Sequence, residues 1–126
     1  MEKINIAEKL SRFSDHWNPR IIGELNGQQV KAAKLKGEFF FHQHELEDEM
    51  FLIVKGTLKM EFRDLPGGQA SRTEILKPGE FIIVPRGVEH KPIAEEEVEL
   101  LLFEPASTLN TGNIENERTK KHLEKI

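Results

Sequence analysis

The sequence predicts an all-β fold, a sandwich or barrel, on the basis of its strand pattern, its turns and its length. From about residue 19 to residue 105, short β-rich runs alternate with breaks made of Gly, Pro or acidic residues. No helical period interrupts them, and about nine strands joined by short turns are typical of a closed all-β architecture. The 126 residues match one domain, with a barrel core at about 19–105 and a tail at 106–126.

The chain begins with a short amphipathic segment. Residues 4–13 carry apolar side chains at spacings that favour one or two turns of helix, and the polar residues that follow keep the helix short. The next two runs, 21–25 and 28–35, flank Asn26-Gly27. Because both central residues of a two-residue hairpin turn need positive φ, this dipeptide predicts the first hairpin.

The remaining runs predict strands separated by short turns. The acidic residues 95–97 predict a turn between the last two strands, and Pro66-Gly67-Gly68 predicts a loop. Beyond Pro105 the chain is polar, which predicts a loop followed by a loosely held tail or a short helix. The predicted strands are residues 38–44, 49–54, 58–63, 72–76, 81–84, 90–93 and 98–103.

Composition and charge exclude several classes of function. The net charge of −4 argues against a surface that follows nucleic-acid phosphates and against a basic membrane-binding face. No run approaches the roughly 18 to 20 apolar residues that span a bilayer, and the start of the chain lacks the apolar region of a signal peptide. We therefore expect a cytoplasmic protein. The absence of cysteine leaves His and carboxylates as ligands for any metal.

Three histidines and a glutamate form a candidate metal-binding set. If residues 38–44 are a strand, His42 and His44 point to the same face. Glu49 follows a polar turn that can return its carboxylate to His44, and His90 joins them only if the barrel closes. Imidazoles and a carboxylate suit a divalent ion such as iron, manganese, nickel or zinc. The alternative is a pair of exposed histidines beside a solvated acidic turn, because His-x-His alone is a weak motif.

Two spaced motifs make the chain resemble a small single-domain cupin. The first cupin motif is Gly, five residues, His-x-His, three or four residues, Glu, six residues and Gly. The chain has four residues in place of the first five, and its matching positions are Gly37, His42-Gln43-His44, Glu49 and Gly56. The second motif is Gly, five residues, Pro-x-Gly, two residues, His, three residues and Asn. Its matching positions are Gly79, Pro85-Arg86-Gly87 and His90, with Ala94 in place of the Asn.

The resemblance, which extends from Asn18 to Gly112, is to small bacterial cupins that are likened to mannose-6-phosphate isomerase. It implies a double-stranded β-helix, or jelly-roll barrel, with one divalent metal ion per chain. By resemblance, the four ligand roles fall on His42, His44, Glu49 and His90.

The resemblance also implies isomerase, dioxygenase or decarboxylase chemistry on a small polar molecule. Glu49 is then a candidate proton shuttle if it is loosely coordinated. A non-catalytic, metal-containing barrel that binds a sugar or a small carboxylic acid is the alternative, and a barrel without metal is a third hypothesis.

Further positions are candidates for contact with the small-molecule ligand. Apolar residues in phase with the metal ligands would line a narrow pocket or simply fill the barrel. Glu104 would point inward, to accept a hydrogen bond from an imidazole or to contact substrate, unless it lies at the wet rim. Arg86 could hold a carboxylate or phosphate, or remain solvated. The candidate ligand-contacting residues are Phe40, Phe51, Ile53, Met60, Arg86 and Glu104.

The chain is also expected to form a homodimer. Strict alternation along residues 38–44 would put Phe39 and Phe41 on the outer face, where aromatic rings are unfavourable in water. A second copy would cover them, and the N-terminal strand is expected to be shared between protomers, as in many cupins.

Overall fold

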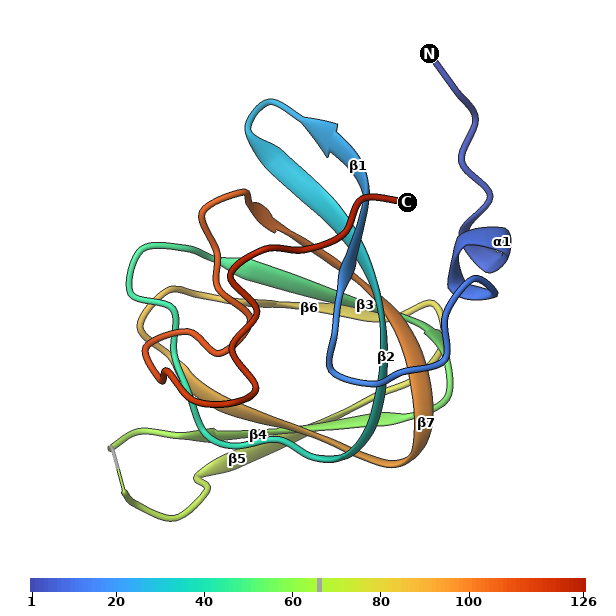
Figure 1. Ribbon diagram of the computed structural model, residues 1–126. Helices are drawn as coiled ribbons and strands as arrows, with labels where there is room; N and C mark the ends of the chain where they lie inside the picture. Colours follow the sequence, from blue (N-terminus) through green and yellow to red (C-terminus); the bar gives the residue numbers. More distant parts are fainter. Residues whose placement is uncertain (66) are drawn as a thin grey trace.

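The computed structural model describes residues 1–65 and 67–126, which fold into one short helix and seven strands (Figure 1). The predicted all-β class is confirmed. Pro66, in the loop expected at 66–68, lies outside the described residues. Within the described ranges, no helix is long and apolar enough to cross a membrane. The elements are α1 (Ile6–Leu10), β1 (Arg20–Leu25), β2 (Gln28–Glu38), β3 (Glu49–Lys55), β4 (Leu58–Arg63), β5 (Arg72–Leu76), β6 (Phe81–Val84) and β7 (Glu89–Pro105).

Strand β7 connects the two layers of the fold. From Ile93 to Pro105, β7 pairs antiparallel with β2, with Glu38 opposite Ile93 and Gln28 opposite Pro105. The first half of β7 also pairs with β4, and its second half pairs with β3. One layer therefore runs β1-β2-β7-β3-β6, while β4 and β5 extend from the first half of β7 in the other layer (Figure 1). The layers enclose a common interior, as in a jelly roll.

A bulge in β7 explains why the sequence predicts two strands there. The register jumps between Leu35 opposite Val98 and Gly37 opposite Ala94, so the acidic residues 95–97 of β7 face only Lys36 of β2. All three acidic side chains are exposed. Extra residues in one strand bend it without ending it. The turn expected at 95–97 is therefore wrong: these residues form an acidic bulge in one continuous strand.

The strand expected at residues 38–44 is also wrong for most of its length. β2 ends at Glu38, and beyond it the backbone makes only an isolated bridge between His42 and His90. Because the segment is irregular, its side chains do not alternate between two faces. Phe39 is only 8% exposed instead of facing water, so it is not the outer-face residue that the homodimer prediction assumed.

Two apolar clusters stabilise the fold. The first fills the space between the layers and contains Ile53, Leu58, Met60 and Leu100, each no more than 1% exposed. In the second, Leu10 of α1 packs with other apolar residues on the outer side of the sheet. Asn5 caps α1 by accepting a hydrogen bond from the backbone N–H of Glu8 at 2.9 Å. The members of the second cluster are Leu10, Phe13, Ile22, Ala32 and Leu101.

Strand β1 is joined to β2 by a tight turn and to the C-terminal end of the chain by hydrogen bonds. Asn26 and Gly27 have φ values of 50° and 77°, which confirms the two-residue hairpin between β1 and β2. The backbone N–H of Ile21 donates to Glu124 O at 2.9 Å, and that of Ile126 donates to Ile21 O at 3.0 Å. The C-terminal segment therefore runs beside β1 (Figure 1). It is not the loosely held tail that its polar composition predicts.

Candidate metal centre

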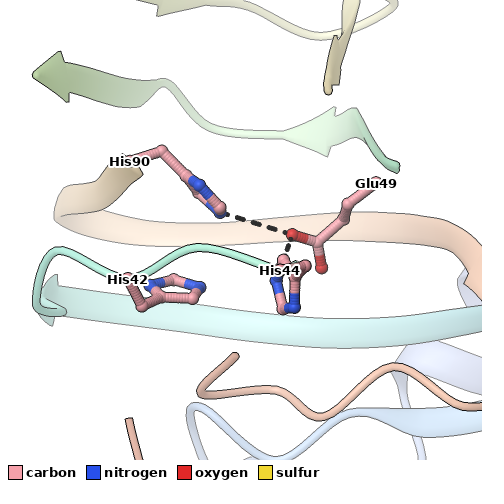
Figure 2. A group of neighbouring side chains, drawn as sticks. All are labelled: His42, His44, Glu49 and His90. Atoms are coloured by element: carbon pink, nitrogen blue, oxygen red, sulfur yellow. Dashed lines mark ion pairs between the residues drawn. The ribbon is translucent and has the colours of Figure 1, made fainter. Parts of the chain in front are cut away.

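The fold brings the four predicted ligands to one point in the interior. His42 and His44 come from the irregular segment after β2, Glu49 is the first residue of β3, and His90 is the second residue of β7. One ligand atom from each residue lies within 4.8 Å of the others (Figure 2). All four side chains are at most 4% exposed. The structure thus places the set together, consistent with a single metal site.

Backbone hydrogen bonds position the imidazoles. His42 and His90 exchange two of them, N–H of His42 to O of His90 at 3.1 Å and N–H of His90 to O of His42 at 2.9 Å. This bridge aligns the two residues across the barrel, and their ring centroids lie 4.3 Å apart. The carbonyl of His44 accepts a hydrogen bond from the N–H of Gly87 at 2.8 Å. The Pro85-Arg86-Gly87 turn therefore fixes the second histidine as well as leading to the third.

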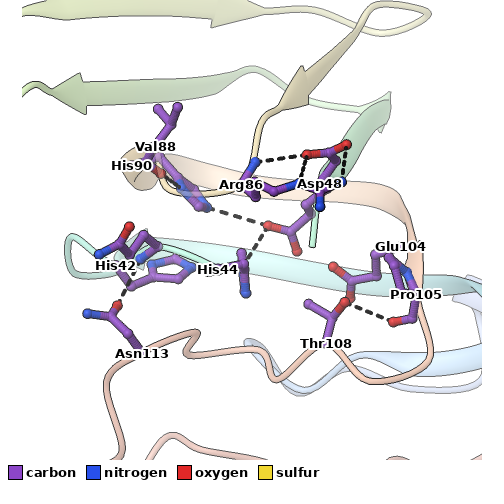
Figure 3. Close-up of polar contacts among 12 residues, drawn as sticks. His42, His44, Asp48, Arg86, Val88, His90, Glu104, Pro105, Thr108 and Asn113 are labelled. Carbon is purple, nitrogen blue, oxygen red and sulfur yellow. Dashed lines mark hydrogen bonds and ion pairs between the residues drawn. The ribbon is translucent and has the colours of Figure 1, made fainter. Parts of the chain in front are cut away.

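Hydrogen bonds also leave the Nε2 atoms of two rings free to bind a cation. Nδ1 of His42 lies 3.0 Å from Phe40 O. Nδ1 of His90 lies 2.9 Å from Val88 O (Figure 3). A carbonyl can only accept, so each Nδ1 carries the proton and donates, and each neutral ring keeps Nε2 as its lone-pair atom. Burial, together with nearby His90, lowers the pKa of His42 to about 3, which keeps this imidazole neutral.

The donor set fits a divalent ion because its buried polar atoms lack other partners. Among the described residues, both ring nitrogens of His44, Nε2 of His90 and Oε1 of Glu49 have no hydrogen-bond partner. Oε1 of Glu49 nevertheless lies 3.1 Å from His44 Nε2 and 3.4 Å from His90 Nε2 (Figure 2). Buried polar atoms are normally satisfied. Nitrogen and oxygen ligands converging in this way suit iron, manganese, nickel or zinc.

Glu104 is a buried acid whose charge interacts with that of the ligand Glu49. Burial by itself would raise the pKa of Glu49, but the nearby Glu104 carboxyl group and the imidazoles of His44 and His90 hold it well below its usual range. Burial and the charge of Glu49 in turn raise the pKa of Glu104 well above its usual range, against the lowering effect of Lys31. Glu104 therefore points inward, as predicted. Its Oε1 accepts a hydrogen bond from Lys31 Nζ at 2.7 Å rather than from an imidazole N–H, and among the described residues its Oε2 has no hydrogen-bond partner.

A largely apolar pocket opens onto the centre. His42 and Glu49 belong to its lining, which otherwise comes mainly from β2, β3, β7 and the segments around residues 17–19 and 39. The pocket is narrow, with a cavity volume of about 40 Å³. Among the described lining residues, Asn110 is the third with a polar side chain, after His42 and Glu49. Apolar members of the lining include Trp17, Leu35, Phe39, Phe51, Leu100 and Leu102.

The predicted ligand-contacting residues are divided between the pocket and other places. Phe51 lines the pocket, whereas Ile53 and Met60 fill the interior cluster. Phe40 is outside the lining; its neighbour Phe39 is in it, because the irregular backbone breaks the alternation. Arg86 is exposed, and its guanidinium lies 3.3 and 3.4 Å from the carboxylate of Asp48 (Figure 3).

Sequence reasoning missed most of the lining residues, including Trp17, Phe39 and Asn110. Trp17 lies far from the metal motifs in the chain and carried no local signal for the pocket. The single Trp beside Asn18-Pro19 was the feature that could have drawn attention to this segment.

The C-terminal segment closes over the ligand-bearing segment. Asn113 N–H donates to Gln43 O, and Gln43 N–H donates to Asn113 Oδ1, both at 2.9 Å. Gly112 has φ 59°, and a Cβ added there would lie 2.1 Å from Gln43 O and 3.1 Å from Cδ2 of His42. Only glycine permits this close approach. The tail therefore helps to hold the segment that carries His42 and His44.

Comparisons with known proteins agree with this fold and site. The sequence profile of the cupin domain matches residues 31–104. The uncharacterised protein YdbB of Bacillus subtilis (strain 168) is 30% identical over 86 residues, which are 68% of this chain and 65% of that relative's length. The crystal structure of a cupin-2 domain protein from Shewanella frigidimarina is 43% identical and covers 81% of this chain and 93% of its own, with a TM-score of 0.74.

A more distant likeness concerns the fold alone. A hydroquinone 1,2-dioxygenase from Sphingomonas sp. TTNP3, solved with 4-hydroxybenzoate bound, has a TM-score of 0.67 at 16% identity. It covers 82% of this chain and 74% of its own. From its motifs, its folded structure and the matching profile, the chain belongs to the cupin family.

Proposed function

We propose that the chain is a metal-dependent enzyme that acts on a small molecule held between the metal centre and the apolar pocket. The observation that carries this proposal is the group of buried, unpaired ligand atoms on His44, Glu49 and His90 next to a pocket that includes His42 and Glu49. A purely structural metal site is closed on all sides by protein ligands, whereas this one has a pocket beside it.

The residues of the chain would have separate tasks at such a site. The divalent ion would supply a Lewis acid that polarises an oxygen atom of the substrate. The neutral imidazoles and Glu49 would hold this ion. The apolar walls of the pocket would exclude water and orient the substrate. Glu104, whose pKa is raised by burial, would accept a proton from Glu49 during turnover. This pair is the proposed route for a proton, with Glu49 as the shuttle.

The reaction classes proposed are isomerisation, dioxygen-dependent cleavage and decarboxylation. The named activity of the Sphingomonas enzyme, which shares the fold, is a reason to include hydroquinone in a substrate panel. The panel would also contain a sugar phosphate and a β-keto acid. Protein loaded separately with Fe(II), Mn(II), Ni(II) or Zn(II) would be assayed by oxygen uptake and by mass spectrometry of products.

We expect turnover by at least one metal form, abolished by His42→Ala and retained by His122→Ala. His122 is an exposed histidine of the tail, so it controls for the loss of an imidazole away from the centre. No turnover by any metal form on any panel member would argue for the second candidate, a non-catalytic metal-containing barrel that binds a small molecule. One observation favours that candidate: apart from His42 and Glu49, Asn110 is the only polar side chain in the described pocket lining, and it is not an acid or base.

A further inference from the structure

We propose that the pocket binds a flat, uncharged aromatic molecule whose oxygen-bearing edge faces His42 and Glu49. This inference rests on the proposed function, because it assigns a ligand class to the same site. It narrows the small polar molecule expected from the sequence to one with an apolar ring and a single polar edge.

The first observation is a stacked aromatic wall. Trp17 and Phe39, both in the lining, have ring centroids 4.7 Å apart and planes inclined by only 20°. Phe39 in turn stacks on Phe40, with centroids 4.1 Å apart. Aromatic rings favour other flat rings in offset or edge-on contact, beyond the gain from burying apolar area. This wall is therefore a better partner for a planar ring than for a puckered one.

The second observation is that Trp17 is held in a costly backbone conformation. Its φ is 59°, a left-handed value that is rare for a bulky residue. Two hydrogen bonds hold it there, from its backbone N–H to Lys34 O and from indole Nε1 to Lys36 O, both 2.9 Å long. Strain of this kind persists only where the surroundings enforce it, and it is concentrated at binding and catalytic sites.

The guanidinium of Arg118 also contacts the stacked rings of the wall from outside the pocket. The guanidinium carbon of Arg118 lies 5.7 Å from the Trp17 ring centroid and 5.3 Å from that of Phe39. Its NH1 group donates to Glu38 O at 3.3 Å, and Arg118 is not part of the lining. The rings are therefore ordered before a ligand arrives, which reduces the entropy cost of binding.

The third observation is the charge of the pocket. The described lining contains no Lys or Arg, and its polar side chains are His42, Glu49 and Asn110. A ligand carboxylate or phosphate placed against the apolar part of the lining would be buried without a cationic partner, which is strongly unfavourable. A hydroxyl or carbonyl oxygen directed to the metal-ligand end avoids this cost. The pocket thus selects against the charged sugar phosphates that a general survey of small metabolites would include.

The chain carries its own reporter for this test. Trp17 is the only tryptophan of the sequence, so its fluorescence, excited at a wavelength where phenol absorbs little, reports occupancy of the pocket. Phenol, cyclohexanol and benzoate would be titrated into zinc-loaded protein. They share a six-membered ring, while cyclohexanol is not flat and benzoate is anionic. We expect phenol to bind about fivefold to tenfold more tightly than cyclohexanol in zinc-loaded protein. In metal-free protein we also expect phenol to bind more tightly than benzoate, because no cation then pairs with the carboxylate. Equal affinities for phenol and cyclohexanol would overturn the ligand class.

A pair of matched variants tests whether the preference for phenol over cyclohexanol depends on the aromatic wall. Phe39→Leu should weaken phenol about fivefold to tenfold and leave cyclohexanol almost unchanged. Phe41→Leu is the control: Phe41 lies outside the lining, beneath the guanidinium of Arg63 at 4.2 Å from its centroid, and its replacement should change neither affinity. Equal weakening of phenol by both variants would contradict a specific wall.

The same titration in metal-free protein separates this inference from the proposed function. Because the wall contains no metal ligand, the preference for phenol over cyclohexanol should persist there, with a lower affinity. If the protein takes up no metal but still prefers phenol, the proposed function fails and the ligand class stands. If zinc binds and no preference is found, the ligand class alone fails.

Discussion

Lys31 of β2 and Glu104 of β7 form a buried ion pair, with 2.7 Å between Nζ and Oε1 and no more than 2% exposure of either side chain. The charge of Glu49 acts on Glu104, so a lysine of the second strand is linked electrostatically, through one carboxyl group, to the candidate metal centre. Lys31 thus offers a positive charge to a pair of acids that would otherwise repel each other. A buried cation of this kind is costly unless it is paired.

Removing one member of this pair should destabilise the fold. Lys31→Met leaves Glu104 buried without its cation, and we expect the free energy of unfolding to fall by about 3–5 kcal/mol. Urea denaturation of metal-free protein measures this loss. Lys31→Met combined with Glu104→Leu should recover part of the loss, because no charge is then left unpaired. A double variant as unstable as the sum of the two single variants would show that the residues are not coupled.

Glu104 should also affect metal affinity. Glu104→Gln keeps the size of the side chain but removes the carboxyl group whose charge acts on Glu49, and loss of such a supporting group costs about 10-fold to 100-fold in metal affinity. Competition with a chromophoric chelator measures the affinity, and the visible spectrum of the cobalt form reports whether the ligand geometry changes. Glu96→Gln, in the exposed bulge of the same strand, should have no effect. Equal metal affinities of the wild type and Glu104→Gln would show that Glu104 does not support metal binding.

The metal-free protein should lose stability as the pH falls below about 6.5. The pKa of His42 is lowered to about 3 in the fold, from 6.5. Between these values the unfolded chain binds a proton that the folded chain excludes, so acidification favours unfolding, by at most about 1.4 kcal/mol per pH unit. The contribution of neutral His42 to the free energy of unfolding is complete above pH 6.5, its pKa in the unfolded chain. This contribution is lost as the pH falls toward about 3, its pKa in the folded chain. Unfolding measured from pH 7 to pH 5 should show a shallower slope in His42→Gln, and equal slopes would contradict the assignment.

Gly112 should be intolerant of a side chain. In Gly112→Ala the new Cβ would meet Gln43 O, so the tail must move away from the segment that carries His42. We expect a loss of stability of more than about 1 kcal/mol together with weaker metal binding. Gly27→Ala is the matched control, since Gly27 also has positive φ but no atom within 4 Å of an added Cβ. A similar loss in both variants would mean that backbone strain, and not the clash with Gln43, is responsible.

The homodimer remains a proposal, and the support for it lies on β6. Phe81 and Ile83 of this strand are 57% and 54% exposed. A surface of this kind is commonly covered in an oligomer. Light scattering should give twice the 14.5 kDa mass of the chain, and Phe81→Glu should restore the monomer mass. Leu46→Glu, at a 77% exposed loop position, should leave the dimer intact. A monomeric wild-type protein would contradict the proposal.

The ligand set could be predicted because its spacing is largely local. His42, His44 and Glu49 lie within one short stretch, and the Gly87 turn before His90 is fixed by its own residues. The two-residue turn at Asn26-Gly27 was predictable for the same reason. In these places the conformation depends on residue types close in the sequence.

The pocket wall was less predictable because it depends on tertiary contacts. Residues 39–44 have strand-like composition, yet only one bridge forms there, and Phe39 turns inward to meet Trp17. The acidic residues 95–97 resemble a turn, but pairing with β2 on both sides keeps them in β7. The pairing of Lys31 with Glu104 joins residues 73 positions apart, and neither has a local pattern that marks it.

Metal content is the most direct test of the central claim that His42, His44, Glu49 and His90 hold one ion. The protein would be purified without a histidine tag and without added metal, and its metals would be measured by mass spectrometry against protein concentration. The account predicts close to one divalent ion per chain, lost in the His42→Ala, His44→Ala double variant, which remains folded by circular dichroism. Metal well below one ion per chain in the wild type, or an unchanged content in the folded double variant, would contradict it.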